Sequence, residues 1–134
     1  MTLDFIWDLE PIKIAALADI DTQAEAVRGR FMTLGSGQAM VYDQKRDEAE
    51  TFMENPDIAP GLIPHLVSES VMNGISPFDQ AVIYLTMRQI WLTVSPVIEE
   101  RRLAAKTAVA AATTPAAIYE AQSIDWSDLE ALVA

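Results

Sequence analysis

The chain has 134 residues, 51% of them hydrophobic, and its 20 acidic and 9 basic residues give a formal net charge of −11. This length supports one domain with a modest core, and the excess of acids argues against binding to nucleic acid phosphates, which takes clustered Lys and Arg. Because there is no cysteine, disulfides, thiolate nucleophiles and Cys-ligated zinc are excluded.

Residues 1–9, MTLDFIWDL, form an apolar N-terminal arm in which Phe5 and Trp7 are the candidate anchors. Such a terminus docks either on a neighbouring molecule or on its own domain, and the sequence leaves both alternatives open. Acids stand where a signal peptide needs a basic region. We therefore expect no signal peptide and synthesis in the cytoplasm.

Apolar residues at steps of three and four predict a first helix over residues 11 to about 32, with Pro11 suited to its start. This stripe consists of Leu17, Ile20, Ala24, Val27 and Phe31. Gly35 and Gly37 then interrupt the pattern, either as a tight reversal or as a softened point in one long helix. Residues 10–54 are thus expected to be a helical hairpin or a kinked helix.

Residues 38–54 are predicted to be a mostly charged helix with a narrow apolar stripe. The acidic residues of this helix, together with the acid that follows it, are Asp43, Asp47, Glu48, Glu50, Glu54 and Asp57. We expect them to form a solvated face rather than a cation site, because they lack the loop spacing of a calcium site. Closely spaced prolines make residues 55–64 a connector. A short helix over residues 64–73 should follow, with Gly74 as its C-terminal cap.

Residues 76–112 are predicted to be the long central helix. Ser76 caps it, Pro77 suits its first turn, and Pro96 should bend it. Its apolar stripe comprises Ile83, Met87, Ile90, Val94 and Val97, and resumes at Ala104, Ala108 and Ala111. Because Arg88 and Gln89 lie at the centre of its most apolar part, we expect a buried helix rather than a membrane span.

Residues 113–134 are an acidic C-terminal segment in which Thr114 caps a last short helix. Alternating runs typical of strands are lacking, so the predicted class is all-α, a single domain of three to four main helices in a hairpin or bundle. Stripes with coiled-coil spacing close either within one chain or between chains. We expect a homo-oligomer, in the first instance a trimer.

No residue pattern supports catalysis. His65 is the only histidine, and no adjacent residue supplies a base, a nucleophile or a metal-ligand partner. We therefore expect no enzymatic activity, no catalytic residue, no metal and no cofactor. A small-molecule substrate, nucleic acid and membrane are likewise not expected as partners.

Four segments carry a family resemblance: residues 30–49 (RFMTLGSGQAMVYDQKRDEA), residues 101–106 (RRLAAK), the Thr114-Pro115 break and residues 125–127 (DWS). Together they resemble small helical proteins encoded among the tail and tail-fibre genes of tailed bacteriophages. The resemblance implies a structural role in the virion or in fibre assembly. It implies no catalytic residue.

The expected function is therefore that of a virion component associated with the tail or tail fibre, which binds itself and other virion proteins. The candidate interface residues are Phe5, Trp7, Ile83, Met87, Ile90, Trp91, Val94 and Val97. Two alternatives remain. One is a tail-fibre assembly chaperone, absent from finished particles, and the other is an acidic DNA mimic that inhibits a host protein.

Overall fold

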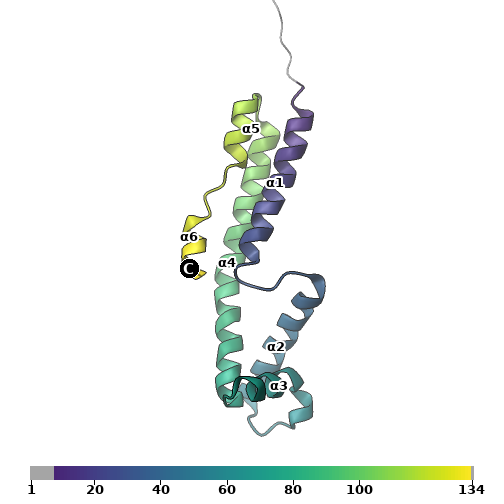
Figure 1. Cartoon of the computed structure of the whole chain (residues 1–134), viewed down its shortest axis with the longest axis vertical. Helices are drawn as coiled ribbons and strands as arrows, with labels where there is room; N and C mark the ends of the chain where they lie inside the picture. The colour runs from purple at the N-terminus through teal and green to yellow at the C-terminus, as the bar shows by residue number, and fades with distance from the viewer. Residues whose placement is uncertain (1–7, 134) are drawn as a thin grey trace, which may run out of the picture. The chain divides into compact units, whose positions relative to one another are not determined.

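The computed structural model describes residues 8–133, and all regular structure in this range is helical (Figure 1). The helices are α1 (Glu10–Arg28), α2 (Ser36–Glu54), α3 (Pro64–Asn73), α4 (Pro77–Ala111), α5 (Pro115–Gln122) and α6 (Ser127–Glu130), with short 3-10 helices η1 (Pro60–Leu62) and η2 (Ala131–Val133). No strand occurs between residues 8 and 133, which confirms the all-α class for this part of the chain. Phe5 and Trp7 lie outside the described residues.

The chain divides into two compact units. Of the described residues, unit 1 comprises 8–30 and 94–133, and unit 2 comprises 31–93. Helix α4 contributes to both, because the boundary falls between Thr93 and Val94, inside the helix. Because α4 belongs to both units, the two units are separate packing clusters joined by one continuous helix. The prediction of a single domain stays a prediction.

The predicted helix caps are confirmed. The Asp79 N–H donates to Ser76 Oγ over 3.0 Å at the start of α4, and the Ala117 N–H donates to Thr114 Oγ1 over 3.1 Å at the start of α5. Gly74 ends α3 at φ 65°, a left-handed conformation in which glycine avoids the strain of a Cβ. These signals are local, so each could be found without knowing the fold.

The first two helices have different bounds from those predicted. Helix α1 ends at Arg28, not near residue 32, and α2 begins at Ser36 rather than at residue 38. Gly35, whose φ of 122° is open to glycine, breaks the path of the chain immediately before α2, whereas α1 already ends at Arg28, directly before Gly29. The Ala39 N–H then bonds the Gly35 carbonyl over 3.1 Å, which places Gly37 inside the first turn.

The core of unit 1 joins α1, the second half of α4 and α5, which lie side by side in Figure 1. Its buried members are Ala16, Ile20, Ala105, Val109 and Ile118. Most of the stripe predicted on α1 is therefore used within the chain, since Ile20, Ala24 and Val27 are all buried. These residues are not available to a second copy.

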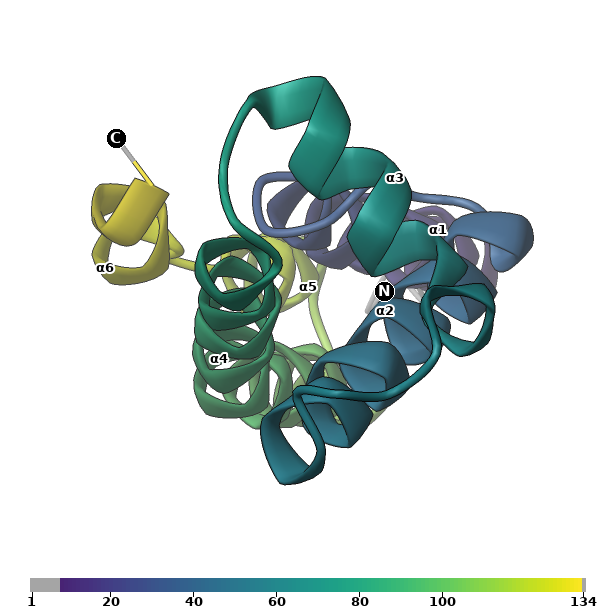
Figure 2. The same cartoon turned by 90° about the horizontal axis from the view of Figure 1, so that it is seen from below.

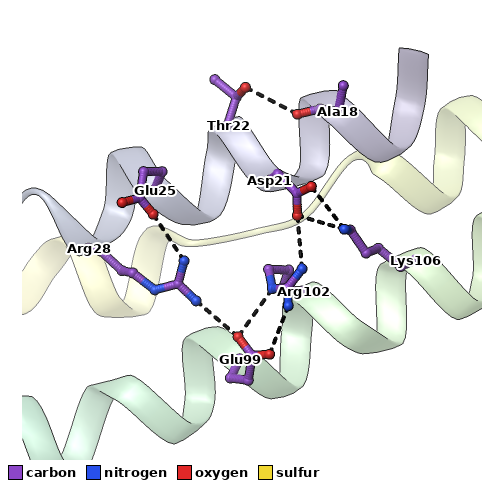
Figure 3. A network of polar contacts seen from close by, with 8 residues as sticks. All are labelled: Ala18, Asp21, Thr22, Glu25, Arg28, Glu99, Arg102 and Lys106. Carbon is purple, nitrogen blue, oxygen red and sulfur yellow. Dashed lines mark hydrogen bonds and ion pairs between the residues drawn. The ribbon is translucent and has the colours of Figure 1, made fainter. Parts of the chain in front are cut away.

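An ion-pair network also joins α1 to α4 in unit 1 (Figure 3). The Arg102 guanidinium donates over 2.9 Å to Asp21 Oδ1 and over 2.9 Å to Glu99 Oε1. The Lys106 ammonium donates to the second carboxylate oxygen of Asp21, Oδ2, over 2.9 Å. Arg28 extends the network by donating to Glu99 over 2.9 Å. The Lys106 and Arg102 bonds lower the pKa of Asp21, and the hydrogen bond from Arg102 lowers the pKa of Glu99.

The core of unit 2 is formed by α2, α3 and the first half of α4, drawn in blue to teal in Figure 2. Its buried members are Ala49, Ile63, Leu66, Ala81 and Tyr84. Phe52 and Met53 pack against it from α2. The narrow apolar stripe expected on residues 38–54 is therefore present, and it faces this core.

Helix α4 packs on a different stripe from the predicted one. The side chains it buries include Tyr84, Val94, Ile98, Ala105 and Val109. Of the predicted stripe only Val94 belongs to this set, whereas Ala104, Ala108 and Ala111 are exposed. By length and composition α4 is apolar enough to cross a membrane, yet its buried side chains belong to the cores of the two units.

Candidate functional site

Unit 2 contains a pocket of about 260 Å³. It is lined by α2, α3, the first half of α4 and the segment that precedes α2. Its lining residues are Phe31, Met32, Tyr42, Asp43, Lys45, Arg46, Glu69, Asn73, Gln80, Ile83, Tyr84, Met87, Arg88 and Trp91. All of them lie between residues 31 and 93, so the pocket belongs to unit 2 alone.

One wall of the pocket is apolar and comes from α4. Ile83, Met87 and Trp91 line it at steps of four, which places them above one another on one face of the helix. Phe31 and Met32 add apolar surface from the segment before α2. The pocket thus offers sulfur and aromatic groups suited to contact with an aromatic or aliphatic side chain.

The pocket also carries cations, unlike the chain as a whole. Lys45, Arg46 and Arg88 line it with only Asp43 and Glu69 as acids, an excess of positive charge in a chain of net charge −11. Lys45 is paired with Glu69 and lies 5.4 Å from the centre of the Tyr84 ring. Arg88 has no ion-pair partner among residues 8–133, so its charge is available to a ligand.

Arg46 is only partly satisfied. Its buried Nε lies 2.8 Å from Asp47 Oδ1, but no acceptor completes a hydrogen bond to it in this part of the chain. The two observations agree if the contact with Asp47 is an ion pair without hydrogen-bond alignment, since distance alone does not make a hydrogen bond. Arg46 therefore lines the pocket with its charge already paired with Asp47 and with a buried Nε that lacks an aligned acceptor.

A polar network holds the pocket wall in place. Burial and the neighbouring Glu69 carboxylate raise the pKa of Tyr84, so its hydroxyl stays protonated and donates, including over 3.3 Å to the His65 carbonyl. Burial alone would raise the pKa of Glu69, but hydrogen bonds from Lys45 and Tyr84 lower it. Asn73 also donates to the buried Gln80 over 2.8 Å, which ties α3 to α4.

Glu48 corrects the expectation that the acids of α2 are all solvated, because it is 2% exposed. Its Oε1 accepts the Leu66 N–H over 3.1 Å, and its Oε2 lies 2.6 Å from His65 Nδ1. Gln44 donates to Oε2 over 3.1 Å. These contacts fasten α2 to the start of α3, and neither Glu48 nor His65 lines the pocket.

The predicted interface residues are divided between several environments. Ile83, Met87 and Trp91 line the pocket together. Ile90 is exposed outside it, whereas Val94 is 1% exposed and already covered. Val97 is half-buried in unit 1, and Phe5 and Trp7 lie outside the described residues.

Sequence reasoning missed the pocket's cations and the pair Glu48–His65. Glu48 and His65 are 17 positions apart in the sequence, and helical spacing predicts no contact at that separation. One signal was available for Glu48: it directly precedes the apolar Ala49 and faces Gln44 four residues earlier. Among residues 8–133 no group of three or more potential ligands suits a metal ion.

A second hollow, in unit 1, is lined by Asp21, Thr22, Glu25, Arg28 and Arg102. Its charged groups are paired with each other or with Glu99 and Lys106, so it is part of the network that joins α1 to α4. The unit 2 pocket is therefore the better candidate site.

No protein-family model, curated protein or solved structure matches this chain.

Proposed function

We propose that this protein is a non-enzymatic structural protein that assembles with copies of itself and with larger partners through the first half of α4. In this proposal it is a tail or tail-fibre component of a bacteriophage virion, and its helices form the contacts. The placement in a virion rests on the sequence resemblance. The role of α4 as the contact surface rests on its side chains.

The observation that carries the proposal is an exposed apolar stripe on α4. Ile83, Met87 and Ile90 follow one another at steps of four and three, and their exposed fractions are 44%, 40% and 44%. The helix packs in its own unit through Ala81 and Tyr84, which leaves this second stripe uncovered. Contiguous exposed apolar surface of this kind marks protein–protein contact sites.

The spacing of the stripe also supports contact with another helix. Steps of four and three bring apolar side chains onto one seam, the arrangement by which helices of a coiled coil interlock. The seam is short, because Val94 is already buried. A homo-oligomer, with a trimer as the first expectation, would cover residues 83–90 from each copy.

The described acids lend less support to a DNA mimic. Such a mimic needs rows of unpaired carboxylates, whereas Asp21, Glu99 and Asp128 are engaged with arginines. A tail-fibre assembly chaperone would use the same exposed stripe, but only transiently. Mass spectrometry of purified particles distinguishes the two, because the chaperone would be missing from them.

Light scattering across a dilution series tests the self-assembly directly. We expect one mass above that of the monomer, and we expect Ile90→Glu to lower it by placing a charge in the seam. Ile14→Glu is the matched control, because Ile14 is also an exposed isoleucine on a helix but lies on α1 of unit 1. A monomer at every concentration, or equal effects of the two substitutions, would contradict the proposal.

A further inference from the structure

The unit 2 pocket has the size and chemistry to receive an aromatic side chain flanked by acid. Cavities of about 150 Å³ admit a benzene ring, and this pocket is larger at about 260 Å³. Its apolar wall includes Met87 and Trp91, and its cation Arg88, which has no ion-pair partner among residues 8–133, retains capacity for a carboxylate. A fitting ligand therefore combines an aromatic ring with nearby negative charge.

The chain itself contains such a segment. Residues 1–7 read MTLDFIW, in which Asp4 directly precedes Phe5, and Asp8 directly follows Trp7. The first basic residue of the sequence is Lys13, so no side-chain cation offsets these acids within the segment. Residues 1–7 lie outside the described part of the chain, which begins at residue 8, two residues before α1.

A neighbouring copy is the natural source of the segment. Ile83 and Met87 belong both to the pocket wall and to the exposed stripe on α4. A second molecule packed on the stripe therefore lies beside the pocket. This step rests on the self-assembly proposed above, and it adds which part of the neighbour completes the contact.

We propose that residues 1–7 of one copy occupy the unit 2 pocket of a neighbouring copy, with Trp7 against Met87 and Trp91 and with acidic Asp4 near Arg88. The aromatic side chain buries apolar surface that the pocket leaves open, and the carboxylate pairs with a cation that has no ion-pair partner in the described chain. Exchange of the segment then links successive copies.

Paramagnetic broadening in the full chain tests the exchange. Because the protein has no cysteine, Thr2→Cys gives a single position for a nitroxide label. Spin-labelled chains are mixed with chains that carry isotope-labelled methionine methyl groups and no nitroxide. We expect the Met32 and Met87 methyl signals to lose clearly more intensity than that of Met72, which is exposed and outside the pocket lining.

Two controls make the result specific. Trp7→Ala in the spin-labelled chain should restore the Met32 and Met87 signals, and Arg88→Gln in the isotope-labelled chain should weaken the loss. Equal broadening of Met72 would show non-specific contact and overturn the inference. Broadening seen only when nitroxide and isotope are on the same chain would place the segment in its own pocket and also overturn it.

Light scattering of the same mixture separates this inference from the proposed function. An oligomer without broadening at Met32 and Met87 would overturn the exchange of residues 1–7 and leave self-assembly through α4 intact. A monomer would overturn both. An oligomer with clearly more broadening at Met32 and Met87 than at Met72 supports both.

Discussion

Units 1 and 2 each have an apolar core, but they differ in where they place their polar groups. Unit 1 places apolar side chains such as Ile20 and Val109 inside and its ion pairs outside, around Arg102. Unit 2 buries polar groups, Glu48 and Gln80 among them, and leaves Ile83 and Ile90 exposed. An exposed apolar stripe beside a buried polar network is costly for a unit that works alone. In the assembly proposed above, unit 1 would act as the scaffold and unit 2 would provide the contact surface.

The largest effect is expected from the core of unit 1. Ile20→Ala removes a fully buried side chain between α1 and α4, and it should lower the free energy of unfolding by about 3–4 kcal/mol. Ile14→Ala, at a position 59% exposed on the same helix, should cost no more than about 0.5 kcal/mol. Urea unfolding measures the free energy of unfolding of both variants. A decrease below about 1 kcal/mol for Ile20→Ala would show that this core contributes little to the stability of unit 1.

In unit 2, by contrast, we expect a large loss of stability when a buried polar residue is substituted. Glu48→Ala leaves the Leu66 N–H and His65 without their acceptor, at a cost of about 2–3 kcal/mol. Glu50→Ala is the matched control, because it removes an exposed glutamate two residues along α2. Hydrogen exchange should locate the loss of protection in α2 and α3, while α5 of unit 1 stays protected. Similar stability of the two variants would remove the contrast between the units.

The surface ion pairs of unit 1 should matter less. Arg102→Met removes the links to Asp21 and Glu99 but keeps the apolar stem, so we expect a loss of at most about 1 kcal/mol. The difference from the unmodified chain should shrink as salt is added, because exposed pairs are screened. Urea unfolding at low and high salt is the measurement, and a salt-independent loss would indicate that packing rather than charge is responsible.

The sequence predicted helix caps better than helix faces, although it misplaced the end of α1 and the start of α2. Ser76, Gly74 and Thr114 act on their immediate neighbours, so their roles follow from local patterns. The stripe on α1 was also found, because Ile20 and Ala24 belong to its only long apolar seam. Such features depend on residues within one or two turns.

Helix α4 shows why the rest was missed. It is apolar on more than one side, so the stripe through Ile83 and the buried stripe through Tyr84 satisfy the same three-four spacing. Periodicity alone does not choose between them, and the partner helices make the choice. The same holds for the pocket, whose cations come from α2 and α4 and meet only in the folded unit.

The smallest expected effect is the loss of stability at low pH when the Asp128 carboxylate is protonated. Arg101 donates to both oxygens of Asp128 over 2.7 Å, and this hydrogen bonding lowers the pKa of Asp128 from 3.8 to about 2. A carboxyl with a depressed pKa in the folded state stabilises that state above the unfolded value, here 3.8, and the contribution is lost as the pH falls towards 2.

A carboxyl NMR titration should therefore give a midpoint for Asp128 well below 3.8, and Arg101→Gln should raise it towards the ordinary value. Arg102→Gln is the control and should leave the midpoint in place, because Arg102 pairs with Asp21 and Glu99. Arg101 also lies 5.9 Å from the centre of the Trp126 ring, so its substitution should loosen α6 as well. If both variants shifted Asp128 equally, the effect would come from the general charge of unit 1 and not from this bidentate bond.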